Sequence, residues 1–270
     1  MLTARGLRFH YLDWGAADRP ALVCLHGITQ TAHSWDEVAP ELAREFRVLC
    51  IDQRGHGDSD WAPDGDYSRH TQAEDLEGIR TALGLESFVL AGMSMGGINA
   101  ITYTVRYPER VRALIIVDVS PQIEAKGVEN IRQFIQQEDI LPNFEDFVAR
   151  AHAFNPRRSL ENIRSRLAHN LKQLPDGRWT WKYDPYLRSP ERSFRASALL
   201  GLWDDVAKIR CPTLIVKGAE SDILSPEAAR RLQEAIPGSV LVTIPGAGHS
   251  VMGDNPQAFV AAAQSFLARL

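Results

Sequence analysis

The fold is decided by residues 88–97, Phe-Val-Leu-Ala-Gly-Met-Ser-Met-Gly-Gly. The apolar start of this stretch predicts a buried strand, and residues 98–105 can continue as a helix. Between them lies Gly92-x-Ser94-x-Gly96, the spacing of a nucleophile elbow. So tight a turn leaves no room for Cβ atoms beside the serine, which explains the flanking glycines. The motif places Ser94 at a helix N-terminus, where free N–H groups favour developing negative charge, and predicts a nucleophile.

Length and composition indicate an ordinary soluble globular protein. The chain has 270 residues, 44% of them hydrophobic and 24% charged, enough for one α/β domain with an insertion. A net charge of -4 gives no reason to expect a nucleic acid or an anionic membrane as partner. The N-terminus lacks the apolar core of a signal peptide, and no apolar run approaches the roughly 20 residues of a membrane span. We therefore expect a cytoplasmic protein that acts on a small molecule.

The three cysteines, Cys24, Cys50 and Cys211, cannot all pair with one another. Two of them lie within predicted buried strands, and the third directly precedes another strand. We interpret them as reduced packing residues and expect neither a metal nor a cofactor. The oligomeric state is left open by the sequence.

Apolar strands alternate with helices along most of the chain. Strands are predicted at residues 21–25, 48–51, 111–117, 212–218 and 240–244 besides the elbow strand, with an exposed edge strand at 7–14 and helices at about 34–46 and 71–83. This alternation indicates an α/β fold, a mostly parallel doubly wound sheet with helices on both faces.

The alternation stops at Pro121 and resumes after about residue 200. The intervening sequence has no strong strand pattern and contains short helical segments broken by prolines, Pro190 among them. We predict an inserted helical cap at residues 121–200, with residues 1–120 and 201–270 forming the core.

A serine nucleophile needs a general base, and the base needs a third group that fixes its tautomer. His249 follows the last strand, and Asp222 follows the strand before it. Both lie beyond the carboxyl ends of predicted parallel strands, where such sheets gather their ligands. The order Ser94, Asp222, His249 is the one expected for this arrangement.

Four motifs in this order resemble the α/β-hydrolase family: His26-Gly27, the loop at 52–59, the elbow at 92–97 and Gly248-His249. The resemblance covers nearly the whole chain apart from the cap. It implies a Ser-His-Asp triad and an oxyanion hole formed by the backbone N–H groups of Ile28 and Met95. His26, Arg54 and His56 are expected to organise their loops rather than to transfer protons.

The acid of the triad has two candidates. Typical family members place it three residues after the strand-end glycine, where this chain has Ser221, so Asp222 requires one extra loop residue. Asp118, at the end of an earlier strand, is the alternative, because some members supply the acid from there. We predict Asp222.

Serine at the elbow argues against a dehalogenase or an epoxide hydrolase, which need a carboxylate nucleophile. The elbow and the 52–59 loop look most like those of small esterases and enol-lactonases. We predict a carboxylic-ester hydrolase that forms an acyl-enzyme on Ser94. A carbon–carbon bond or enol-lactone hydrolase and a low-turnover ligand receptor are the alternatives.

The cap has 13 basic and 10 acidic residues, although the whole chain is acidic. Most of these charges are expected on a solvated face. One arginine, with Arg192 and Arg195 among the candidates, could instead turn inward and bind a substrate carboxylate. Trp181 and Tyr183 are expected to wall the pocket. Of the two possibilities, we favour a hydrophobic pocket for neutral esters.

Overall fold

The computed structural model describes residues 1–189 and 199–270. Pro190, Arg192 and Arg195 therefore lie outside the described residues. In the described part, the main sheet consists of β3 (Tyr11–Trp14), β4 (Ala21–Leu25), β5 (Arg47–Ile51), β6 (Phe88–Met93), β7 (Val111–Val117), β11 (Thr213–Gly218) and β12 (Val240–Ile244). Its strand order is β12-β11-β7-β6-β4-β5-β3, and only β3 runs antiparallel to its neighbour. The predicted α/β fold is confirmed.

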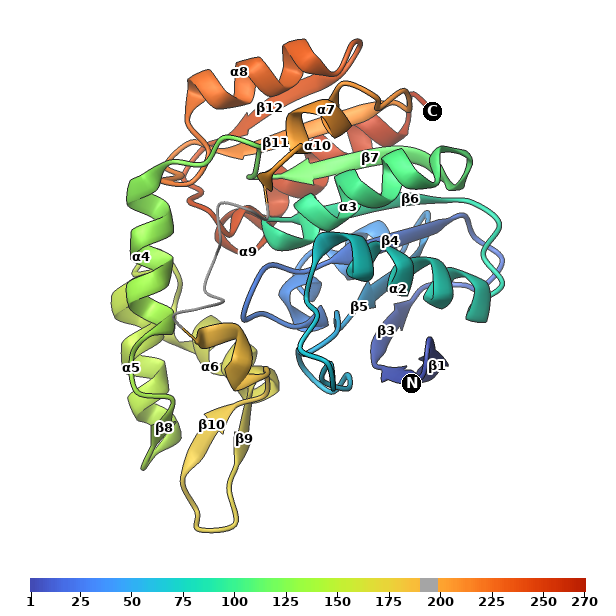
Figure 1. Ribbon diagram of the computed structural model, residues 1–270. Helices are drawn as coiled ribbons and strands as arrows, with labels where there is room; N and C mark the ends of the chain where they lie inside the picture. Colours follow the sequence, from blue (N-terminus) through green and yellow to red (C-terminus); the bar gives the residue numbers. More distant parts are fainter. Residues whose placement is uncertain (190–198) are drawn as a thin grey trace.

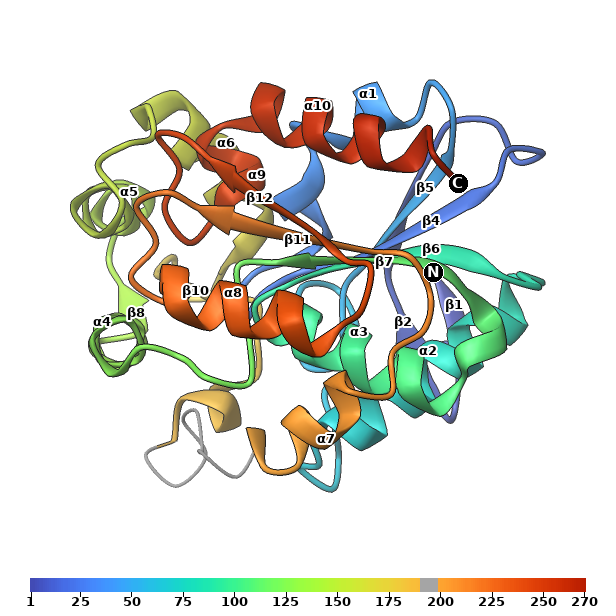
Figure 2. The same cartoon turned by 90° about the horizontal axis from the view of Figure 1, so that it is seen from above.

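Helices cover both faces of this sheet (Figure 2). One face packs against α2 (Arg69–Ala82), α3 (Met95–Arg106), α7 (Leu202–Val206) and α8 (Pro226–Ala235). The opposite face packs against the 3-10 helix η1 (Ala32–Trp35), α1 (Ala39–Leu42), α9 (Val251–Asp254) and α10 (Pro256–Leu267). A short 3-10 helix, η2 (Pro108–Arg110), joins α3 to β7. The central strands are therefore apolar on both faces, as their continuous hydrophobic runs predict.

Two predicted elements differ from the structure. The expected helix at 34–46 is divided into η1 and α1, because Pro40 has no N–H to donate within a continuous helix. The expected edge strand at 7–14 is also divided. Its first half, β2 (Leu7–Phe9), pairs with β1 (Leu2–Ala4), and its second half is β3. The backbone N–H of His10, between the halves, donates to Ser59 Oγ at 2.8 Å.

Between β7 and α7, residues 125–188 pack beside the core near the carboxyl end of β7 (Figure 1). We refer to residues 125–188 as the cap. It contains α4 (Ala125–Ile135), β8 (Ile140–Leu141), α5 (Phe144–Phe154), α6 (Leu160–Asn170), β9 (Leu171–Gln173), β10 (Trp179–Trp181) and the 3-10 helix η3 (Pro185–Arg188). The cap has its own apolar cluster around Phe147, Leu167 and Trp181.

The small antiparallel sheet β8-β10-β9 was not predicted. Its strands have only two or three residues, too few for an alternation of apolar and polar positions to be visible in the sequence. Tertiary packing rather than local pattern makes these segments extended.

All three cysteines have free thiols, and Cys24 and Cys50 are partners across β4 and β5 in the buried core. Burial raises the pKa of the Cys50 thiol, which keeps it protonated. These observations agree with a packing role for the pair. No helix among the described residues is both long and apolar enough to cross a membrane.

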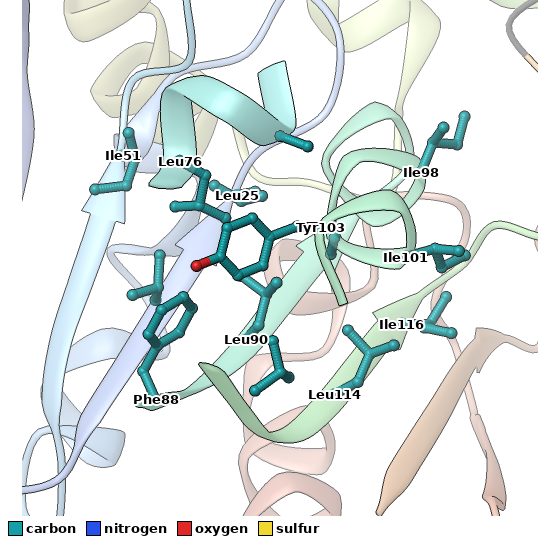
Figure 3. Close-up of a cluster of buried hydrophobic side chains, with 14 of the residues drawn as sticks. Leu25, Ile51, Leu76, Phe88, Leu90, Ile98, Ile101, Tyr103, Leu114 and Ile116 are labelled. Atoms are coloured by element: carbon teal, nitrogen blue, oxygen red, sulfur yellow. The ribbon is translucent and has the colours of Figure 1, made fainter. Parts of the chain in front are cut away.

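Figure 3 shows Leu90 of β6 among side chains from both neighbouring strands and α3. We expect Leu90→Ala to lower the free energy of unfolding by about 2–5 kcal/mol, because the surrounding core cannot fill the space left. Leu200→Ala is the control, since Leu200 is 78% exposed, and should change it by less than about 0.5 kcal/mol. Urea unfolding measures both. Equal losses would contradict the placement of Leu90 in the core.

Candidate active site

Ser94 lies between the end of β6 and the start of α3 in a strained backbone conformation, with φ 53° and ψ -118°. Its backbone N–H donates to the carbonyl of Val117 at 3.1 Å, which ties the turn to β7. A Cβ at Gly92 would lie 2.2 Å from the carbonyl oxygen of Gly96, and one at Gly96 would lie 2.4 Å from that of Leu25. Both flanking glycines are therefore required by close backbone contacts.

The carboxylate beside His249 belongs to Asp118, which directly follows β7. His249 Nδ1 and Asp118 Oδ2 are 2.8 Å apart. The same carboxylate accepts the backbone N–H of Gly218 at 2.8 Å and the hydroxyl of Ser221 at 2.5 Å. Asp118 is fully buried and has a positive φ of 52°, so its backbone is strained like that of Ser94.

The prediction that Asp222 contacts His249 is wrong, and the alternative, Asp118, occupies that position. Asp222 accepts a hydrogen bond from Asn130 Nδ2 of α4 at 2.7 Å. The physical reason is the loop after β11, where Ser221 faces Asp118 and the next residue is directed toward the cap. A sequence signal was present, since Ser221 stands where an acid is expected and can donate to a carboxylate from the neighbouring strand.

The turn that carries His249 is held from two sides. A Cβ at Gly218 would lie 2.1 Å from the carbonyl oxygen of Gly248, so the turn packs directly on the end of β11. Asp254 accepts the backbone N–H of Gly248 at 3.0 Å and pairs with Arg158 of the cap at 2.8 Å. Both charged side chains are almost completely buried. Sequence reasoning missed this ion pair, because its partners are far apart in the chain.

The loop after β4 lies against the nucleophile. A Cβ at Gly27 would be 3.4 Å from the Cβ of Ser94, and the next residue, Ile28, lines the cavity in front of Ser94. Met95 is the first residue of α3, where backbone N–H groups have no acceptor within the helix. The two residues predicted for an oxyanion hole thus flank Ser94 from separate elements.

His26 organises this loop, as expected. Its Nδ1 bonds to the carbonyl of Gly27 at 2.7 Å, and its Nε2 accepts the backbone N–H of Gln53 at 3.0 Å. Gln53 extends the network, since it donates to the carbonyl of His26 and accepts from Asn99 of α3, both at 2.7 Å. Burial lowers the pKa of His26, so its imidazole is neutral and can accept.

The loop at 52–59 has the structural role expected of it. Arg54 forms a buried ion pair with Asp75 of α2 and donates to the carbonyl of Asp66 at 2.7 Å. His56 is fully buried and bonds through Nδ1 to the carbonyl of Arg54 at 3.0 Å. Burial lowers the pKa of His56 to about 3. Neither Arg54 nor His56 is among the residues that line the cavity in front of Ser94.

Ser94 and His249 line one cavity of about 830 Å³ between the core and the cap. Part of its wall is apolar and comes from Ile131, Phe134, Phe154, Ile163, Leu167 and Trp181. Trp181 therefore lines the cavity as predicted. Tyr183 does not, because it is buried behind Trp181, with ring centroids 5.8 Å apart, and lies beneath the guanidinium of Arg188.

Two groups of side chains in the described part of the chain could hold a metal ion: His33, Asp36 and His169, and His10, Asp52 and Asp58. Neither includes Ser94 or His249. The rings of His33 and His169 are stacked at 3.5 Å with an angle of 13°, so their nitrogen lone pairs lie in nearly parallel planes. An ion could bind both only if the rings turned.

Known proteins are similar to this chain over most of its length. The family described as alpha/beta hydrolase fold matches residues 20–256. Esterase Rv0045c of Mycobacterium tuberculosis is 31% identical over 92% of this chain and 83% of its own length. A 3-hydroxybutyrate-oligomer hydrolase of Cupriavidus necator is 31% identical over 96% of this chain and 92% of its own length. The crystal structure of an alpha/beta hydrolase from Novosphingobium aromaticivorans has a TM-score of 0.84 and 30% identity, and covers 100% of this chain and 97% of that one.

The chain belongs to the α/β-hydrolase family. At the level of the family, its relatives support hydrolysis as the activity.

Burial of neutral His56 predicts a loss of stability in acid. Its folded pKa of about 3 lies below the ordinary value of 6.5, so the unfolded chain binds the extra proton first as pH falls. The stabilisation is complete above pH 6.5, and about 2 kcal/mol should be lost between pH 6.5 and 5. Urea unfolding across this range should show that the free energy of unfolding depends less on pH in His56→Asn than in the wild type. Some dependence should remain, because the pKa of His26 is also lowered by burial. The exposed-site variant His70→Asn should keep the wild-type slope.

Proposed function

We propose that the protein is a serine hydrolase that cleaves carboxylic esters through an acyl-enzyme on Ser94, with His249 as general base and Asp118 as the triad acid. The observation that carries the proposal is the strained serine elbow and the His249–Asp118 pair at one cavity. Asp118 accepts from Nδ1 of His249, which leaves Nε2 free to take the hydroxyl proton.

In the proposed mechanism, Ser94 Oγ attacks the ester carbonyl carbon while its proton passes to His249 Nε2. The tetrahedral oxyanion accepts hydrogen bonds from the N–H groups of Ile28 and Met95. The bond to the alcohol oxygen then breaks, and the alcohol leaves with the proton from His249. Water, deprotonated by His249, attacks the acyl-enzyme, releases the carboxylic acid and restores Ser94. No metal or cofactor is needed for these steps.

Two similarities support esters as substrates: one relative is named an esterase and another a hydrolase of 3-hydroxybutyrate oligomers. A cavity of about 830 Å³ with an apolar wall suits a small acyl or aryl ester or a lactone. A ligand receptor on the same fold is the competing possibility, and it is separated from an enzyme by counting turnovers.

Ser94→Ala should lower kcat/KM for a short-chain 4-nitrophenyl ester by about 10³-fold or more and leave the fold intact. His249→Ala should cost nearly as much. The double variant should be hardly worse than either single one, because the two side chains act as a unit. Steady-state assays with circular dichroism as the folding control provide the test. Additive losses, or a single turnover in the wild type, would contradict the proposal.

The two acids can be separated by matched substitutions. Asp118→Asn should lower kcat by about 10³–10⁴-fold, because an asparagine cannot hold His249 in the required tautomer. Asp222→Asn should have little effect, since Asp222 bonds to Asn130 rather than to the imidazole. Steady-state kinetics of both variants on one ester measure the difference. A crippled Asp222→Asn with an active Asp118→Asn would overturn the assignment.

A further inference from the structure

The cavity in front of Ser94 contains more positive than negative side chains. Its cations are Lys126, Arg150, Arg157, Arg158 and Arg166, and its carboxylates are Glu220, Asp222 and Asp254. Two of the cations are already neutralised, because Arg157 pairs with Glu220 at 2.7 Å and Arg158 pairs with Asp254 at 2.8 Å. Lys126 is exposed. Arg150 and Arg166 are half-buried, and neither forms an ion pair among the described residues, so their charges at the cavity need a separate explanation.

Arg166 belongs to a face of α6 that is turned toward the cavity. Ile163, Arg166, Leu167 and Asn170 all line it, with the i, i+3, i+4, i+7 spacing of one helix face. Arg166 Nη2 donates to the neutral hydroxyl of Ser34 at 3.1 Å. Within residues 1–189 and 199–270, no carboxylate forms an ion pair with it. Four of its five N–H donors thus have no acceptor among the described residues.

Asn170, one turn further along α6, is oriented by the core. Its Oδ1 accepts the hydroxyl of Thr31 at 2.9 Å, so its Nδ2 group has two donors and no acceptor among the described residues. Thr31 and Ser34 belong to the segment that directly follows the loop containing Ile28. The anchors of Arg166 and Asn170 therefore hold both side chains against the core segment that follows Ile28, one of the residues predicted for the oxyanion hole.

Arg150 is differently placed. It donates to the carbonyl of Glu138 and lies over the ring of Phe147 at 5.5 Å, so both contacts are within the cap. It has no anchor near Ser94. Of the two arginines, Arg166 is the one that is held against the core, through Ser34.

We propose that Arg166 and Asn170 form a carboxylate-binding subsite, and that the preferred substrates are esters whose acyl group carries a second, free carboxylate. The planar guanidinium can bind both oxygens of a carboxylate, and the neighbouring amide supplies one more donor. The proposal rests on the ester hydrolysis proposed above. It changes the expectation from sequence, which favoured an apolar pocket for neutral esters.

The test compares two esters with the same leaving group, mono-4-nitrophenyl adipate and 4-nitrophenyl pentanoate, which differ by the terminal carboxylate. The wild type should have the higher kcat/KM for the adipate ester, and this preference should fall as salt rises. In Arg166→Gln the ratio of the two kcat/KM values should fall by about 10- to 100-fold, the range expected for hydrogen bonds to a charged group. Asn170→Ala should lower the ratio in the same direction but less.

The matched control is Arg164→Gln. Arg164 is on the same helix but is solvent-exposed and paired with Glu145 at 2.8 Å, so the ratio should remain that of the wild type. Arg150→Gln tests the other unpaired arginine. An equal fall for both esters in Arg166→Gln, a fall in the ratio only in Arg150→Gln, or a wild-type preference for the pentanoate ester at every salt concentration would overturn the proposal.

The outcomes also distinguish this proposal from the proposed function. Hydrolysis that depends on Ser94 but shows no role for Arg166 would leave the function standing and remove the subsite. If neither ester is hydrolysed, the esterase proposal fails, and calorimetry with the adipate dianion tests the subsite alone. Binding should then be about 10-fold or more weaker in Arg166→Gln than in the wild type and in Arg164→Gln. Equal binding in all three would overturn it.

Discussion

The candidate site depends on the hydrogen bonds that the buried carboxylate of Asp118 accepts. It accepts the backbone N–H of Gly218, the hydroxyl of Ser221 and a ring nitrogen of His249, and so joins β7, the end of β11 and the turn after β12. Burying a charge without hydrogen-bond partners would lower the stability of the fold. The three donors compensate the buried carboxylate, and the carboxylate in turn satisfies them. The side chain that bonds to the imidazole therefore also holds the carboxyl ends of β7 and β11 together.

A second buried charge pair connects the same turn to the cap. Arg158 pairs with Asp254, which accepts the backbone N–H of Gly248 beside His249. Arg158 also donates to the carbonyl of Ser250 at 3.2 Å. Movement of the cap would thus disturb the imidazole as well as the wall of the cavity. In this protein the segment that lines the cavity and the residue proposed as general base share one hydrogen-bond network.

Backbone strain is concentrated where the chemistry is proposed. Among the described residues, four that are not glycine have positive φ. Of these, Thr29 and Ser94 line the cavity, and Asp118 bonds to His249, which also lines it. Such conformations persist only where the surroundings enforce them. Here the close contacts of Gly92 and Gly96, and the hydrogen bonds of Asp118, supply that enforcement.

The sequence by itself determined the α/β fold, the elbow and the position of His249. Continuous apolar runs, glycine spacing and strand ends are local properties that can be seen without the fold. Tertiary structure alone decided between Asp222 and Asp118, because that choice depends on which strand lies beside β11 and on where Ser221 points. It also placed Arg166 at the cavity and Tyr183 behind it. Those positions follow from how α6 and the small cap sheet pack against the core, and contacts between residues so distant in the chain leave no local pattern.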